Sequence, residues 1–433
     1  MKKKKMKIKL TEKQYDRIII NEDANRFYSQ RNINGDNLKV LWERITEKQK
    51  ELNDMVFSEI DELTKKKAET LDLTLGDALR KTNRDDNLMQ VPKVITTAGN
   101  SKLPQSTLIV NITSALACPS FYLGTCCIKN ATCYAQQDEN RLWHNVADKN
   151  AKTDLMNTEL LRKYQKGNKE PMRKYFSLIE MYINIGNAAA KNLYNEYIRT
   201  YNDSGISPTE QDLKVFKRLS DAFKIKEIRL NESGDFPCQL SINLWSKFAR
   251  KIGRKYGIGV HAYTARYLDF SNTPENFSIM PSHSGINIGN EPYRTYTVVT
   301  DKHYDSLTGG TKLDDNRQPI LGETENGTKY YKCPCSKEES RCSFCNVCMH
   351  KNKTGVPYTI FVKQHAKKNA SGLRMIFTSD EMKDVIDMHN KLGWTSEPEK
   401  KLSAERQKLD KTKKLDSKIL ANRKLKLQQK KKD

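Results

Sequence analysis

Two short segments contain nine of the ten cysteines in this chain, and clustered thiols are suited to metal binding. The first segment reads ACPSFYLGTCCIKNATCYAQ and contains Cys118, Cys126, Cys127 and Cys133. The second reads KCPCSKEESRCSFCNVCMH and contains Cys333, Cys335, Cys342, Cys345 and Cys348. Thiolates gathered in this way bind a soft metal ion or an iron–sulfur cluster. Most of the chemistry that the sequence predicts therefore lies in these segments, and Cys238 stands apart.

The first segment can supply three thiolates from one loop: Cys118, Cys126 or Cys127, and Cys133. Three thiolates can hold a 4Fe–4S cluster and leave one iron open, and a radical S-adenosylmethionine enzyme needs that open iron for its cofactor. The spacing is looser than the C-x3-C-x2-C pattern that is common in such enzymes. Two alternatives stay open, namely a zinc site with a fourth ligand from Cys127 or His144, and buried thiols without metal.

The second segment has the more regular spacing. Cys342, Cys345 and Cys348 form C-x2-C-x2-C, and Cys333 and Cys335 lie just upstream. This spacing is typical of a metal site. A closed zinc site with four thiolates and an auxiliary iron–sulfur cluster fit it equally well. The sequence predicts a metal here without choosing between the two.

From Val91 onward, short apolar runs alternate with segments of helical periodicity. This alternation predicts an α/β core with parallel strands, which would position the cysteine segments. The expected strands are 108–112, 225–230, 258–264, 277–281, 295–300 and 358–362. The expected helices are 152–166, 171–199, 209–223, 239–255 and 378–391. Ligands of such cores gather at the carboxyl ends of the strands, which is where the first cysteine segment begins. We therefore expect a partial (βα) barrel-like core.

Polar residues follow the strand 225–230, in the segment RLNESGDF at 229–236. Glu232 and Asp235 are the candidate catalytic residues, because acidic groups at a strand end can bind a ribose hydroxyl or a substrate amine. The candidate cofactor-binding residues are Arg229, which suits a carboxylate or phosphate, together with Ser233, Gly234 and Tyr134. The alternative is an ordinary turn, because Ser-Gly-Asp is common in turns. His261 lies within an expected strand and is expected to be structural.

The pattern along the chain predicts four parts. Residues 1–90 are polar and helical and read as an N-terminal arm, with Leu41, Ile45, Leu52 and Val56 among its apolar positions. Residues 91–300 form the α/β core, and 301–395 form a cysteine-rich metal-binding segment that completes the core. Within it, 301–330 reads as a long loop. Residues 396–433 form a lysine-rich tail, either helical or without fixed structure.

The charge balance predicts an anionic partner. The chain of 433 residues carries 76 basic and 53 acidic residues, a formal net charge of +23. Nucleic acid, bound through the basic tails, is the simplest such partner, and solubility alone is the competing explanation. The start MKKKKMKIKL has no apolar stretch after it, and the sequence contains no run of about 20 apolar residues. We therefore expect no membrane span and a cytoplasmic location, where clustered cysteines act as metal ligands.

Several short motifs, taken in order, resemble the phage gene product 88 family, which is also found on plasmids. They are AGNSKLP at 98–104, the cysteine loop ending in CYA at 118–135, RLNESGDF at 229–236, Trp245, AYT at 262–264, the cysteine run 333–348, and FVKQH ending at His365. They cover residues from about 94 to 366. The family has no established biochemical role that the resemblance could transfer. The cysteine loop also resembles that of a phage family treated as radical-SAM-like.

Two functions from different classes follow. The first is a radical-SAM-like iron–sulfur enzyme acting on a nucleotide or nucleic acid, with the 4Fe–4S cluster on Cys118, Cys126 and Cys133 and with S-adenosylmethionine as cofactor. The second is a non-catalytic protein, stabilised by zinc, that binds nucleic acid or a host factor. The metal content of the protein separates the two.

Overall fold

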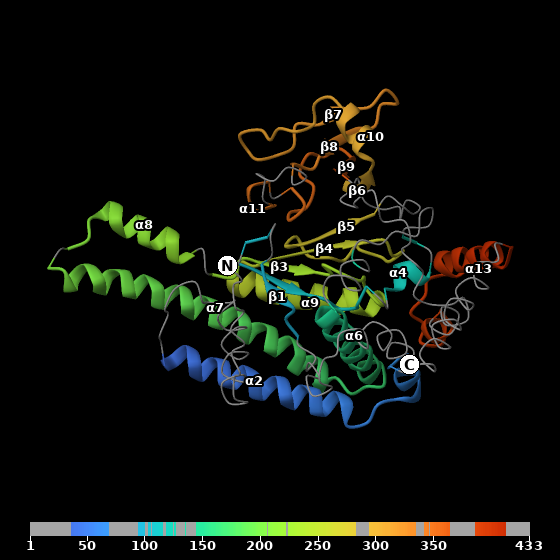
Figure 1. Ribbon diagram of the computed structural model, residues 1–433, viewed down its shortest axis with the longest axis horizontal. Coiled ribbons are helices and arrows are strands. Elements are labelled where there is room, and N and C mark those ends of the chain that lie inside the picture. Colours follow the sequence, from blue (N-terminus) through green and yellow to red (C-terminus); the bar gives the residue numbers. More distant parts are fainter. Residues whose placement is uncertain are drawn as a thin grey trace, which may run out of the picture.

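A five-stranded sheet runs through the middle of the molecule (Figure 1). Its strands are β1 (Thr97–Ala98), β2 (Thr107–Val110), β3 (Glu227–Leu230), β4 (Gly259–Thr264) and β5 (Phe277–Pro281), and they lie side by side in that order. The strands β2 to β5 are parallel, whereas β1 pairs antiparallel with β2. The carboxyl ends of the four parallel strands therefore meet at one edge of the sheet.

The chain is a mixed α/β protein, as its alternating pattern predicts. The computed structural model describes residues 36–68, 94–99, 103–104, 106–115, 118–123, 125–126, 135, 144–205, 207–221, 224–282, 294–334, 342–345, 347–363 and 386–412. The strand predictions are confirmed, each shifted by at most a few residues. The predicted helices within 144–256 are also confirmed. The first part of the helix predicted at 378–391 lies outside the described residues, and 386–391 is helical.

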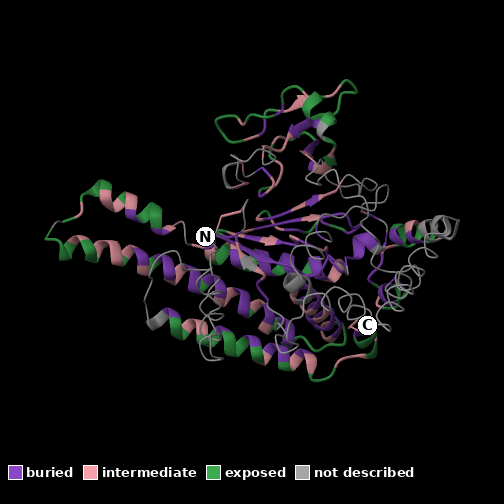
Figure 2. Cartoon of the chain, in the orientation of Figure 1, coloured by how far each residue is buried: buried purple, intermediate pink, exposed green. Residues whose placement is uncertain are grey.

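Helices cover one face of this sheet and share its core. They are α6 (His144–Gln165), α7 (Glu170–Asp203), α9 (Gln239–Tyr256) and, packed on α7, α2 (Asp36–Phe57). The apolar positions of α2, such as Leu52, join one hydrophobic cluster with Ile228 and Val260 of the strands. Figure 2 shows this buried layer, and the outward sides of α2 and of α8 (Glu210–Asp221) are exposed. The helical N-terminal part is thus built into the main core.

The two faces of the sheet differ in chemistry because successive strand residues point to opposite sides. On β3 and β4, Ile228 and Val260 point into the helix-covered core. The alternate positions Arg229 and His261 are register partners and lie on the other face. A face with arginine and histidine is unusual for a buried parallel sheet, whose two sides are normally apolar.

A second sheet continues from the end of the first. Its order is β6 (Arg294–Val299), β9 (Tyr358–Lys363), β8 (Lys329–Lys332) and β7 (Gly322–Glu323). An isolated bridge between Ser282 and Tyr296 links it to β5. The prediction of a long loop at 301–330 is wrong, because this stretch contains the helix α10 (Asp301–Ser306), strand β7 and the start of β8. Local polarity concealed these short strands, which pair only within the tertiary structure.

The C-terminal helix α13 (Glu397–Thr412) is attached to the carboxyl edge of the main sheet. Arg266, just after β4, is completely buried and pairs with the carboxylate of Glu399. All five N–H groups of this guanidinium donate hydrogen bonds, two to Glu399 and the others to carbonyl oxygens of Phe236, Pro237 and Trp394. Glu399 also accepts the N–H of Ser396, as a capping box does. The start of the predicted lysine-rich tail is therefore part of the core.

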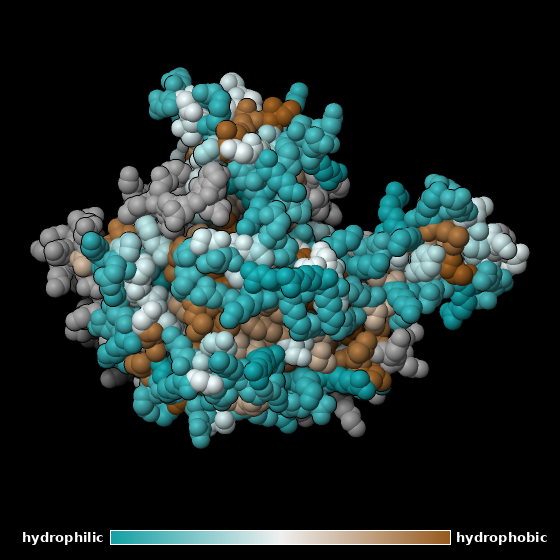
Figure 3. Space-filling view, turned by 180° about the vertical axis from the view of Figure 1, so that it is seen from behind, coloured by the Kyte–Doolittle hydropathy of each residue, from teal (hydrophilic) through white to brown (hydrophobic). Residues whose placement is uncertain are grey.

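The face of the molecule seen in Figure 3 is mostly hydrophilic, with hydrophobic patches in the middle of the view, near its top and on the projecting end. Among the described residues, no helix is long and apolar enough to cross a membrane.

Candidate functional site

Asp235 follows β3, a central strand of the sheet, and lies at the edge where the parallel strands have their carboxyl ends. Its carboxylate is buried and accepts four hydrogen bonds. Two come from hydroxyl groups, at 2.5 Å from Ser120 and 2.6 Å from Thr264, and two come from the backbone N–H groups of Phe236 and Ala265. Burial raises the pKa of Asp235 above its ordinary value, and these donors act in the opposite direction. Asp235 therefore joins three segments, namely the loop after β2, its own turn after β3 and the end of β4.

The first cysteine segment is one of those three. Cys118 is buried just before the short helix α4 (Pro119–Tyr122), and Ser120 of this helix is the residue bonded to Asp235. The carbonyl oxygen of Ser120 accepts the N–H of Thr125 at 3.0 Å and that of Cys126 at 3.1 Å. The loop therefore folds back on Ser120 and brings Cys126 to the segment that holds Cys118. Cys127, Cys133 and Tyr134 lie outside the described residues.

The ends of β2 and β3 are interlocked beside this loop. The side-chain oxygen of Asn111 accepts the N–H groups of Glu232 and Ser233, and that of Asn231 accepts the N–H of Ile112 at 3.1 Å. Gly234 has a φ of 77°, and a Cβ there would overlap the backbone of Thr113. The turn after β3 is thus pressed against the segment after β2.

The site residues predicted in the segment 229–236 fall into two groups, one after β3 and one within it. Glu232, Ser233 and Gly234 lie in the turn at the carboxyl edge, and the hydroxyl oxygen of Ser233 accepts from the amide of Asn150 at 3.3 Å. Arg229 instead lies within β3 on the face opposite the helices, with its guanidinium 4.0 Å from the ring centroid of Tyr263. The catalytic and cofactor-binding roles assigned to these residues stay predictions.

The second cysteine segment lies against the other face of the main sheet. Cys333, Cys345 and Cys348 pack in one cluster with Tyr263 and Tyr331. The Tyr331 hydroxyl is 3.5 Å from the Sγ of Cys345, and Tyr263 is hydrogen-bonded to Cys348. Burial, reinforced by the neighbouring thiol of Cys333, raises the pKa of Cys348 to about 12.

The donor chemistry of this cluster suits zinc or iron, because several thiols come from one short stretch. Cys342 and Cys345 bound the helix α11 (Cys342–Cys345), and Cys335 lies outside the described residues. Among the residues that the structure describes, no three or more His, Cys, Asp or Glu side chains are grouped closely enough to hold a metal ion. The predicted metal ligands therefore stay predictions.

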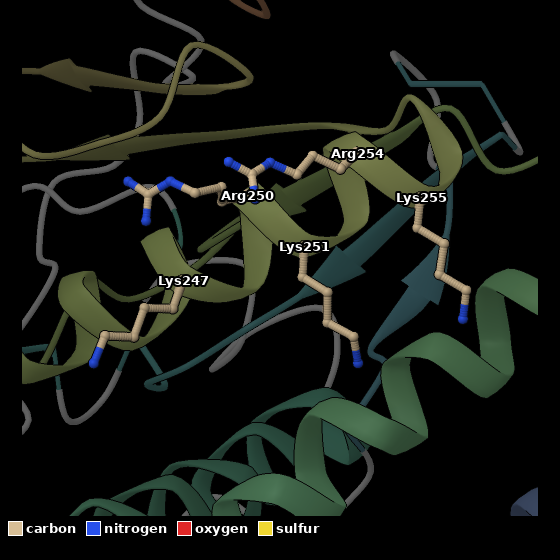
Figure 4. A pocket seen from close by; sticks show the side chains of 5 residues that line it. All are labelled: Lys247, Arg250, Lys251, Arg254 and Lys255. Atoms are coloured by element: carbon tan, nitrogen blue, oxygen red, sulfur yellow. The ribbon is translucent and has the colours of Figure 1, made fainter.

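The sequence interpretation missed a basic stripe on α9 (Figure 4). A hollow of about 500 Å³ lies along the exposed side of this helix, and the described residues that line it are all cations: Lys247, Arg250, Lys251, Arg254 and Lys255. These residues recur at intervals of three and four, so they share one helical face. Lys251 and Lys255 both pair with Glu180 of α7. The spacing is visible in the sequence, but charged helix positions ordinarily face solvent, so the pattern alone does not predict a binding surface.

The stripe and the cysteine loop lie at different ends of the sheet. Helix α9 follows the carboxyl end of β3 and leads back to the start of β4, so its second half lies toward the amino ends of the strands. The stripe belongs to that second half, whereas Cys118 follows the carboxyl end of β2. A ligand on the stripe is therefore separated from the cysteine loop.

These features define an α/β protein with a parallel sheet, polar chemistry at its carboxyl edge, one thiol segment at that edge and a second against one face of the sheet. Comparisons of the chain with protein-family models, with curated proteins and with solved structures found no match. The resemblance to the phage gene product 88 family stays a prediction.

Proposed function

We propose that the chain is a metal-cluster enzyme of the radical-SAM-like kind, with a partial (βα) barrel-like core, that acts on a nucleotide or nucleic acid. The observation that carries this proposal is the anchoring of the cysteine loop, because Ser120 ties the segment of Cys118 and Cys126 to Asp235 at the carboxyl edge of parallel strands. Ligands bind at that edge in parallel α/β folds.

The residues that would hold the 4Fe–4S cluster are Cys118 and Cys126, with Cys127 as an alternative to Cys126, and Cys133. Bound there with S-adenosylmethionine, the cluster would supply one-electron chemistry. The chain's own residues would position the cofactor. The buried Asp235 keeps the loop in place, and Glu232 in the adjoining turn is the candidate group for the polar part of the cofactor or substrate.

Oxygen-free purification tests this proposal. We expect a brown protein with absorbance near ~400 nm, containing iron and acid-labile sulfide. Cys118→Ser should remove about four iron atoms per chain. Cys238→Ser is the matched control, because Cys238 is an equally buried thiol outside both segments, and it should leave the iron content unchanged. A colourless preparation that contains zinc and no iron would refute the proposal.

A second candidate function is nucleic-acid binding without catalysis, in a fold stabilised by zinc at the second cysteine segment. The basic stripe on α9 favours it. All five cations are exposed, and Glu180 is the acidic residue that pairs with two of them. Its length suits a phosphate backbone, since residues 247 to 255 of a helix span about 12 Å. Contacts of this kind bind nucleic acid through charge, and salt weakens them steeply.

Fluorescence anisotropy with labelled DNA in a salt series tests this second function. The triple substitution Lys247→Glu, Arg250→Glu, Arg254→Glu should weaken binding. It should also reduce the slope of log K against log salt concentration by about two to three, because phosphate contacts are lost. The matched control is Lys214→Glu, Lys217→Glu, Arg218→Glu on α8, which changes the charge equally at exposed positions. Equal loss in both variants would show that net charge, and not the stripe, binds DNA.

A further inference from the structure

The face of the main sheet that is turned away from the helices carries a row of polar side chains. Arg229 on β3, His261 on β4 and Ser278 on β5 are successive register partners across the sheet. One row nearer the amino ends, Thr107 on β2 is the partner of Glu227 on β3. Because alternate positions share a face, both rows lie on the same side of the sheet.

Several polar atoms on this face are buried without a hydrogen-bond partner among the described residues. They are Oγ1 of Thr107, Oε2 of Glu227, Nε of Arg229 and Nδ1 of His261. Thr107 is 0% exposed and His261 is 2% exposed. A buried polar group that is left unsatisfied costs about 1–3 kcal/mol. Four such atoms on one face of one sheet therefore indicate a missing polar partner.

The surroundings of His261 carry positive charge. Arg294 of β6 reaches this row, donating to the hydroxyl of Ser278 at 2.8 Å, and its own Nε is also buried and unpartnered. Burial lowers the pKa of His261, and the charges of Arg229, His350 and Arg294 lower it further. Two arginines thus lie near a neutral, buried imidazole. Oε2 of the Glu227 carboxyl group lies 3.7 Å from Nδ1 of His261.

Space for Glu227 exists because the facing residue on β4 is a glycine. A Cβ on Gly259 would come within 2.7 Å of Oε2 of Glu227. Gly259 does not have a positive φ, so its backbone conformation does not require glycine. What glycine provides here is room for the carboxyl group at the edge of the polar face.

We propose that this face of the sheet is a binding site for a small oxyanion, a carboxylate or phosphate group of a ligand, held by Arg229 and Arg294 beside His261. The two unpartnered Nε donors match an oxyanion, which accepts several charge-assisted hydrogen bonds. Thr107 and Glu227 lie one row away and bind the polar atoms of the ligand next to its charged group. The site is separate from the carboxyl edge and from the α9 stripe, and it does not depend on which metal the cysteines bind.

The second cysteine segment forms one wall of this site. The hydroxyl of Ser278 lies 3.3 Å from the carbonyl oxygen of Cys348 and 3.2 Å from that of His350. Tyr263, the next residue along this face of β4, contacts both Cys348 and Arg229. A ligand bound at the polar row would therefore lie between the main sheet and the thiols of the second segment.

Isothermal titration calorimetry with inorganic phosphate and, separately, with acetate tests the proposal on the full chain in 0.5 M sodium chloride. High salt screens surface charge but affects a buried pair much less. We expect one saturable site per chain, and the probe that binds more tightly identifies the kind of oxyanion. Arg229→Gln should weaken that binding at least tenfold. Arg218→Gln, an exposed arginine of α8 outside both proposed binding surfaces, is the matched control and should bind as the wild type does.

A second variant keeps the test decisive if Arg229→Gln does not fold, which circular dichroism will show. Gly259→Ala removes no charge and no hydrogen bond, but its Cβ would come within 2.7 Å of Oε2 of Glu227 and force this carboxyl group of the site to move. It should also weaken binding of the better probe. Saturable binding that both site variants leave unchanged overturns the proposal. The absence of saturable binding for both probes also overturns it, as does a loss of binding in Arg218→Gln equal to that in Arg229→Gln.

Discussion

Replacing Glu227 by glutamine should make the protein more stable at high pH. Burial raises the pKa of this carboxyl group from 4.5 to about 8, and its side chain is 16% exposed. The folded state therefore holds the proton more tightly than the unfolded state. The stabilisation from this proton is complete below about pH 4.5 and is lost as the pH rises through 8.

The size of the effect follows from the two pKa values. Relative to low pH, ionisation of Glu227 costs about 1 kcal/mol of folding free energy at pH 5, about 3 at pH 7 and about 5 at pH 9. Glutamine has nearly the same shape as the protonated side chain and does not ionise. The stability of Glu227→Gln relative to the wild type should therefore increase by about 4 kcal/mol between pH 5 and pH 9.

Urea unfolding of both proteins at pH 5, 7 and 9, in buffers without phosphate or carboxylate, measures this difference. Glu397→Gln is the control, because Glu397 is exposed and its hydrogen bond with Lys400 lowers its pKa. The control should gain no stability at pH 9. A difference between Glu227→Gln and the wild type that does not change with pH would refute the argument that this carboxyl group is buried and protonated.

Two further predictions concern the contacts that hold the carboxyl edge together. Glu399→Gln should destabilise the fold by about 3–5 kcal/mol in urea unfolding, because it leaves the buried charge of Arg266 unpaired, whereas the neighbouring exposed Glu397→Gln should leave the midpoint unchanged. Gly234→Ala should lower the melting temperature more than Gly257→Ala. Both glycines have positive φ, but a Cβ overlaps Thr113 only at Gly234, so equal effects would show that the turn adapts.

Much of the fold could be predicted because its signals are local. The strands at Ile228 and Val260 and the helix that joins them follow from apolar periodicity over a few residues, and a helix–strand alternation predicts parallel pairing. The short strands β7 and β8 were not predicted. They are only two and four residues long, and in β8 two lysines flank the buried Tyr330 and Tyr331. The two strands pair with each other, and β8 pairs with β9, which no local pattern shows.

The candidate site was predictable only in part. The sequence placed Cys118 and Asp235 after two predicted strands, and the structure makes those strands neighbours and joins the two segments through Ser120, which no motif singles out. His261, which the sequence predicts to be structural, is buried in a polar row, and its Nδ1 has no hydrogen-bond partner among the described residues. Its surroundings come from β2, β3, β5 and β6, so only the register of the strands reveals them.

The sequence by itself determined the thiol content, the excess of positive charge and the order of strands and helices, because each of these depends on residue type or on neighbours a few positions away. The tertiary structure decided which groups meet. It buried Arg266 against Glu399 from the supposed tail, placed the guanidinium of Arg229 over the ring of Tyr263, and set the second cysteine segment beside the main sheet. Those contacts join residues up to 133 positions apart, and only the packing of the folded chain brings such residues together.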